Sequence, residues 1–126
     1  MSIRYEVEKN GFLLYANSGN AVSADDIIKL ENSIIADENI KTGYNSLFDW
    51  TQVSRLDIIN DDINEILNIL IKDQKNIHGR KIAIVARPSV ASELSRLIDL
   101  ISENDRNVNL IFFNDISTAK IWLGID

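Results

Sequence analysis

Six residues with polar or indole side chains follow the apolar runs of this sequence: Asp49, Trp50, Asp57, Arg87, Asn114 and Asp115. Because sites in open parallel sheets gather at the carboxyl ends of strands, these residues are the first candidates for a functional site. Asp49 could serve as a metal ligand or phosphate acceptor, and together with Asp57 it could provide the carboxylates of an enzyme. The structural alternative, which we favour, places Asp57, Asn60, Asp61 and Asp115 at helix starts, where such residues cap the helix and the backbone dipole stabilises acids.

Other motifs for catalysis or cofactor binding are missing from the sequence. It contains no cysteine, which excludes disulfides, thiolate metal sites and a cysteine nucleophile. The single histidine, His78, stands next to Gly79 at an expected helix end, so a histidine-based metal site would need carboxylates alone to complete it. The glycines form no nucleotide-binding pattern, and there is no G-x-S-x-G motif. We therefore expect no metal, no cofactor, no catalytic residue and no enzymatic activity.

The composition indicates one globular domain spanning residues 1–126. The chain is 45% hydrophobic, which suits a packed core of that size. Its net charge of −6 repels a phosphate backbone, so nucleic acid is not an expected partner. The start of the chain lacks the apolar core of a signal peptide, and no stretch is long and apolar enough to cross a bilayer. These features predict a cytoplasmic protein with no transmembrane segment.

The hydrophobic periodicity predicts an α/β fold. Strands are expected at residues 3–7, 12–16, 44–50, 81–86 and 108–113. Helices are expected to begin at Ser23, near Asn60, at Pro88 and at Ile116. Asn10-Gly11 fits a tight turn between the first two strands, which would pair antiparallel. The order of elements predicts a mixed, mainly parallel sheet of about five strands with four main helices.

An apolar patch is expected at the end of the chain. Trp122 lies between Ile121 and Leu123 on the short last helix, which cannot bury all its sides equally. The patch around Trp122 could contact another protein or a second copy of this chain, which would give a homodimer. The alternative is that the helix docks fully on the sheet and buries Trp122.

The order of elements, the strands "SLFDW" and "KIAIVA", and the ending "FFNDISTAKIWL" resemble the SpoIIAA-like family. That family has the fold of the STAS domain, named for sulphate transporters and anti-sigma factor antagonists. The resemblance covers nearly the whole chain, and Ala119, Trp122 and Leu123 meet its A-x-x-W-L ending. It implies a STAS-like interaction module, possibly one used in signalling.

The resemblance also places a regulatory loop after the third strand. True antagonists carry approximately D-S-S-G there, and phosphorylation of one serine releases the partner. In this sequence the acid falls on Asp57, Ile58 and Ile59 occupy the serine positions, and Asn60 occupies the glycine position. Because isoleucine has no hydroxyl, the resemblance implies a module without the serine phosphoswitch.

Two hypotheses for function follow. The first is a non-enzymatic interaction module that recognises another protein or its own copy through the loop Thr51 to Ile59. The alternative is a carrier of small apolar, lipid-like molecules, in which Trp50, Ile58 and Ile59 line a pocket; simple core packing would also account for these residues. The candidate binding residues are Asp49, Trp50, Asp57, Ile58, Ile59 and Trp122.

Overall fold

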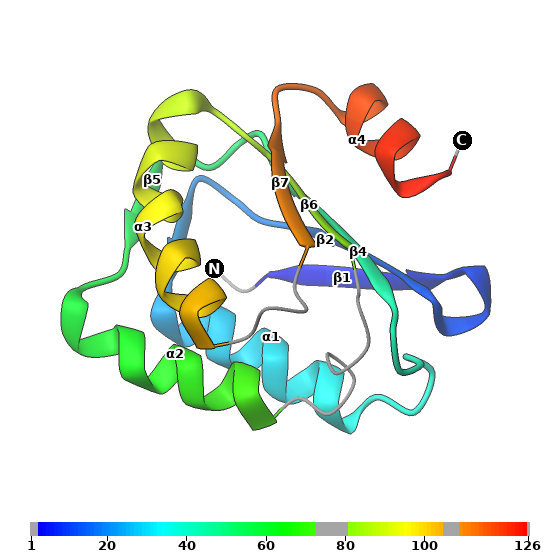
Figure 1. Cartoon of the computed structure of the whole chain (residues 1–126), viewed down its shortest axis with the longest axis horizontal. Helices are drawn as coiled ribbons and strands as arrows, with labels where there is room; N and C mark the ends of the chain where they lie inside the picture. Colours follow the sequence, from blue (N-terminus) through cyan, green and yellow to red (C-terminus); the bar gives the residue numbers. More distant parts are fainter. Residues whose placement is uncertain (1–2, 73–80, 105–108, 126) are drawn as a thin grey trace.

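The computed structural model describes residues 3–72, 81–104 and 109–125 (Figure 1). The elements in chain order are β1 (Arg4–Glu8), the 3-10 helix η1 (Lys9–Gly11), β2 (Leu13–Asn17), β3 (Ala21–Ser23), α1 (Ala24–Ala36), β4 (Asn45–Trp50), β5 (Arg55–Asp57), α2 (Asn60–Lys72), β6 (Lys81–Ala86), α3 (Pro88–Asn104), β7 (Asn109–Phe113) and α4 (Ile116–Leu123). The predicted helix end at His78 and Gly79 lies outside the described residues.

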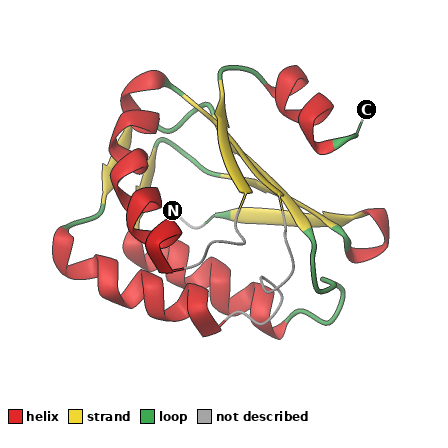
Figure 2. Ribbon diagram, in the orientation of Figure 1, coloured by secondary structure: helices red, strands yellow, loops and turns green. Residues whose placement is uncertain are grey.

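The main sheet has the strand order β1-β2-β4-β6-β7. β1 pairs antiparallel with β2, and the other neighbouring strands pair parallel. Helices α1, α2 and α3 cover one face of this sheet, whereas α4 lies on the other face (Figures 1 and 2). The α/β class, the mixed sheet of five strands and the four main helices are therefore confirmed.

A second, small sheet was not predicted. β3 and β5 pair parallel over three residues each, so the segment expected to be a loop after β4 contains a short strand. β2 also begins one residue later than expected, because Phe12 belongs to the hairpin connection and its side chain is exposed.

The hairpin between β1 and β2 is longer than a two-residue turn. Lys9 and Asn10 adopt left-handed backbone angles, and Gly11 has a φ of 96°. A Cβ atom at Gly11 would collide with the carbonyl oxygen of Asn39, and the Lys41 N–H donates to the Gly11 carbonyl at 2.8 Å. Glycine is needed here because the hairpin packs closely against the segment that follows α1.

The helix boundaries follow local hydrogen bonding. Ser23 and Asp26 form a complete capping box at the start of α1: the Asp26 N–H donates to Ser23 Oγ, and the Ser23 N–H donates to Asp26 Oδ2. Asp115 caps α4, and Gly124 ends it in a left-handed conformation. The sequence predicted these positions because capping depends on neighbours only a few residues away.

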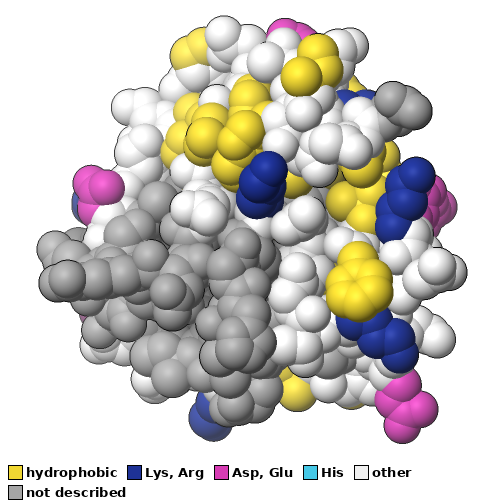
Figure 3. All heavy atoms as spheres, turned by 45° about the vertical axis from the view of Figure 1, so that its right-hand side comes forward, with side chains coloured by type: hydrophobic (Ala, Val, Ile, Leu, Met, Phe, Trp, Pro, Cys, Tyr) yellow, Lys and Arg dark blue, Asp and Glu magenta, His cyan; other side chains and the backbone are white. Residues whose placement is uncertain are grey.

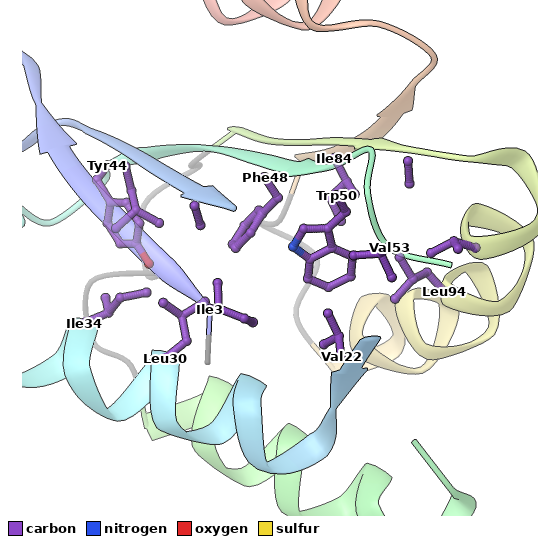
Figure 4. Close-up of a cluster of buried hydrophobic side chains, with 14 of the residues drawn as sticks. Ile3, Val22, Leu30, Ile34, Tyr44, Phe48, Trp50, Val53, Ile84 and Leu94 are labelled. Carbon is purple, nitrogen blue, oxygen red and sulfur yellow. The ribbon is translucent and has the colours of Figure 1, made fainter. Parts of the chain in front are cut away.

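The sheet separates two hydrophobic cores of unequal size. The larger core lies between the sheet and helices α1 to α3, and its buried members include Leu14, Leu30, Ile34, Phe48, Trp50, Ile84, Val90 and Leu94 (Figure 4). The smaller core lies under α4 and contains Leu47, Ala83, Val85, Ala119 and Leu123. Because α4 packs on β4, β6 and β7, no described helix covers β1 and β2 on that face.

Candidate functional site

The six candidate binding residues do not come together in one site. They are Asp49, Trp50, Asp57, Ile58, Ile59 and Trp122. Successive strand residues point to opposite faces of a sheet, so Asp49 and Trp50 of β4 are separated by the sheet itself. Asp49 shares its face with Leu47 and α4, whereas Trp50 lies in the larger core. Asp57, Ile58 and Ile59 lie farther on, at β5 and the start of α2, and Trp122 lies on α4.

Asp49 is held at the end of β4 by local hydrogen bonds. Its Oδ1 atom accepts from the Thr51 N–H at 3.1 Å and from Thr51 Oγ1 at 2.7 Å. The turn is fixed further by Arg87, whose Nε donates to the Thr51 carbonyl at 3.1 Å. Asp49 and Arg87 therefore both stabilise the turn after β4, although they reach it from different strand ends.

An open polar hollow of about 460 Å³ lies beside Asp49. Its lining consists of Arg4, Asn17, Ser18, Gly19, Asp49, Thr51 and Gln52. Arg4 lies opposite Asn17, and Asn17 lies opposite Asp49, so the three form one row across β1, β2 and β4. Sequence reasoning missed Arg4 and Asn17, because the row depends on the register of three strands.

Trp50 is a core residue. Only 4% of it is exposed, and its ring packs edge-on against Phe48 with 5.9 Å between the ring centroids. The nitrogen-bearing edge of the indole points towards Phe48 (Figure 4). Nε1 is buried and has no hydrogen-bond acceptor among the described residues.

Asp57 does not begin a helix. It ends β5, and its carboxylate pairs with Arg55, with 2.9 Å between Asp57 Oδ1 and Arg55 Nε. Both side chains are largely exposed, so the pair adds little to stability. The start of α2 instead uses Asp62, whose Oδ2 accepts from the Ile59 N–H at 3.0 Å. Asp49 and Asp57 line different hollows and do not converge as a carboxylate pair.

The two isoleucines at the expected regulatory corner have different surroundings. Ile58 is half-buried and packs against the larger core, whereas 62% of Ile59 is exposed. Ile58 and Leu56 line an open hollow of about 320 Å³ together with residues of α3, namely Ser92, Glu93 and Arg96. The corner of β5 and α2 thus presents one exposed isoleucine, Ile59, directly after an isoleucine that lines this hollow.

Trp122 is half-buried on α4. Its ring lies 5.7 Å from that of Phe113, and Lys81 Nζ lies 5.3 Å from its ring centroid. The same Nζ donates to the Trp122 carbonyl at 3.1 Å, so the ammonium stabilises both the ring position and the end of the helix. Neighbouring Ile121 is 77% exposed. Figure 3 shows hydrophobic side chains gathered over α4 and β7.

Two negative findings concern the described residues. No group of three or more acidic or histidine side chains within residues 3–72, 81–104 and 109–125 could hold a metal ion. Among the helices in those ranges, none combines the length and the apolar character needed to span a membrane.

Neither a family model nor a curated protein matches this sequence. Among solved structures, the chain is similar to an uncharacterized protein of the DUF3478 family with a SpoIIAA-like fold from Shewanella loihica PV-4. The two are 19% identical, the match covers 97% of this chain and 92% of that chain, and the TM-score is 0.57. At this identity the likeness shows the fold. The SpoIIAA-like fold that the sequence resemblance implies is therefore confirmed.

Proposed function

We propose that this chain is a non-enzymatic interaction module that docks another protein at the corner of β5 and α2. The observation that carries the proposal is the exposure of Ile59: 62% of it is in contact with solvent, and it directly follows Ile58, which lines a hollow with Leu56. Apolar side chains of this kind anchor many protein interfaces when a partner covers them. The docking would use no serine phosphoswitch, because isoleucines occupy the serine positions of that loop.

The charges around the corner indicate the chemistry of the partner. Asp61 and Asp62 occupy the first turn of α2, and Glu93 lies across the hollow beside Arg96. The corner therefore has an apolar centre and a mainly acidic rim. A complementary protein would present an apolar side chain between basic residues, and the opposite charges would speed its association at low salt.

The test uses two isoleucines that are both exposed but lie on different helices. Ile59→Lys should reduce capture of the partner from a cell extract by roughly tenfold or more, since a charge would replace the central apolar anchor. The control is Ile121→Lys, which changes a 77% exposed isoleucine on α4. Quantitative mass spectrometry measures the capture, and circular dichroism checks folding.

Salt provides a second measure of the same docking. Capture should weaken as ionic strength rises, because the acidic rim would be screened from a basic partner. Equal capture by the wild type and Ile59→Lys would contradict the proposal, as would a loss confined to Ile121→Lys.

A second candidate function is the carrier of small apolar molecules. The observation that favours it is Trp50 Nε1, a buried donor without an acceptor. Such a donor typically costs about 1–3 kcal/mol when it is left unsatisfied, and a ligand carbonyl or carboxylate would satisfy it. Neither the hollow beside Asp49 nor the hollow lined by Ile58 has Trp50 in its lining.

Tryptophan fluorescence tests the carrier hypothesis. The chain has two tryptophans, so in Trp122→Phe the tryptophan emission comes from Trp50 only. Titration of this variant with oleate should shift or quench the Trp50 emission if the indole meets the ligand. The matched variant Trp50→Phe reports Trp122 in the same titration. A response limited to Trp122, or no response in either variant, would contradict a ligand site at Trp50.

A further inference from the structure

Within the described part of the chain, no strand pairs with the outer edge of β1. β1 is the first strand of the sheet order and pairs with β2 alone. Besides β2 and η1, no described element packs extensively on it. The strand is tied to the body of the molecule by Tyr5, whose hydroxyl donates to Asp37 Oδ2 at 2.9 Å. Because this contact already holds the strand in place, little further ordering of β1 is needed when a partner strand pairs with it.

Charges alternate along this edge. Arg4, Glu6 and Glu8 are exposed and lie on the face that carries α4, whereas Tyr5 and Val7 are half-buried on the helix side. Within the described part of the chain, none of the three charged side chains forms an ion pair. Edge charges normally discourage pairing with other strands, but they permit a strand with the complementary order of charges.

The order of charges in β1 is complementary to itself when the strand is reversed. In an antiparallel pair of two β1 strands centred on Tyr5, Arg4 of each copy lies opposite Glu6 of the other copy. Tyr5 then faces its own counterpart, and Ile3 faces Val7 on the helix side. Centring the pair on Arg4 would place two arginines opposite each other. Centring it on Glu6 would pair Arg4 with Glu8 twice, but it would also place the two Glu6 carboxylates opposite each other. Of these three registers, the one centred on Tyr5 makes two attractive pairs with no like charges opposite. One register is therefore favoured by charge.

We propose that two copies of this chain dimerise through β1, in the antiparallel register centred on Tyr5, to form one continuous sheet. The two-fold axis passes between the Tyr5 residues, and helices α1 to α3 of both copies lie on the same side of the joined sheet. Backbone hydrogen bonds between the two β1 edges hold the copies together, and the two Arg4–Glu6 pairs set the register. This surface is separate from the β5–α2 corner, so the proposal does not depend on partner docking there.

The opposite edge of the sheet is the main competitor. β7 contains no charged residue in its sequence Asn109–Phe113, and 42% of Ile111 is exposed. An uncharged edge has no order of charges to select one partner strand or one register. Pairing through β7 is therefore an outcome that the experiment must separate from pairing through β1.

Single cysteines distinguish these arrangements cleanly, because the chain has no native cysteine. Opposite residues in antiparallel strands have Cα atoms about 4.5–5.5 Å apart, which is within the range that a disulfide bridges. Tyr5→Cys should therefore form a disulfide-linked dimer under mild oxidation. Glu6→Cys should not, since its counterpart would be displaced by two residues, about 7 Å along the strand. Ile111→Cys reports pairing through β7.

A charge exchange tests the same register without a disulfide, and it keeps the Tyr5–Asp37 hydrogen bond. Glu6→Arg should weaken dimerisation roughly tenfold or more, because arginines would then face each other twice per dimer. Arg4→Glu combined with Glu6→Arg should restore it, since the pairs become complementary again. Glu65→Arg on α2 is the control for net charge. Analytical ultracentrifugation near physiological salt measures the dissociation constants.

The outcomes divide as follows. A dimer linked through Tyr5→Cys and a rescue by the double exchange support the proposal. A monomer at all concentrations overturns it, and so does a double variant as weak as Glu6→Arg. Efficient linkage through Glu6→Cys or Ile111→Cys in place of Tyr5→Cys also overturns it, because the copies would then use another register or another edge.

Discussion

At the residue scale, local hydrogen bonds hold Asp115 at the start of α4. Its Oδ1 accepts from the Thr118 N–H at 2.8 Å and from Thr118 Oγ1 at 3.0 Å. The backbone hydrogen bond from Thr118, and next the hydroxyl of the same residue, hold the pKa of this carboxyl below its usual value of 3.8. The carboxylate form is thus favoured in the folded chain.

The sign of the pH effect follows from this lowered pKa. Asp115 stabilises the folded state at pH values above 3.8, and the contribution is lost as the pH falls through the lowered pKa. Asp115→Asn keeps a good N-cap but does not titrate. Thermal unfolding followed between pH 7 and pH 2 should therefore show a smaller loss of Tm for Asp115→Asn than for the wild type. Parallel curves for the two proteins would contradict this assignment.

Residue identity alone was a poor guide to which side chains meet. Asp49 and Trp50 are neighbours in the sequence, yet the alternation of β4 places them on opposite faces of the sheet. The same alternation was visible in the sequence and could have separated them. Asp57 was harder to assign, because it ends β5 and pairs with Arg55. A strand of three residues is too short for its alternation to be recognised in the sequence.

At the element scale, α1 illustrates what hydrophobic spacing can resolve. In the sequence, Ile34 and Ile35 both follow Ile27 and Leu30 at helical spacing. In the structure Ile34 is fully buried in the larger core, whereas 39% of Ile35 is exposed. Adjacent residues on a helix are about 100° apart, so both cannot face the sheet equally. The identity of the buried residue depends on how the helix is rotated about its axis, which the sequence pattern leaves open.

These two neighbours provide a matched test of packing. Ile34→Ala should destabilise the protein by about 2–5 kcal/mol, because it leaves a cavity in a filled core. Ile35→Ala should cost less than about 1 kcal/mol, since the side chain is largely in water and alanine favours the helix. Urea denaturation of both variants measures the difference. Similar losses in the two variants would show that α1 is rotated from the position described here.

The elements that the sequence failed to predict share one property. β3 and β5 each contain three residues, and they pair with each other across more than thirty positions of the chain. A period of two cannot be recognised over three residues, and the pairing energy comes from a distant strand. By contrast, the capping box at Ser23 and the cap at Asp115 were predictable, because each involves residues three apart.

At the scale of the whole molecule, the two faces of the sheet differ in how completely they are covered. Three helices lie on one face, and the single short helix α4 lies on the other (Figure 1). The sequence predicted the number of helices and the mainly parallel sheet, because crossover connections follow fixed rules. It could not predict that Arg4, Asn17 and Asp49 would form one polar row across β1, β2 and β4, since that requires the strand order and register.

The location of β1 at both the beginning of the chain and the border of the sheet has a practical consequence. A purification tag fused ahead of residue 3 would emerge within a residue or two of Arg4, next to the border where we place the second copy. A bulky fusion at that end would hinder assembly and yield a misleadingly monomeric preparation. A tag attached beyond Ile125, after α4, would leave that border unobstructed, so the proposed dimer could be measured without this interference.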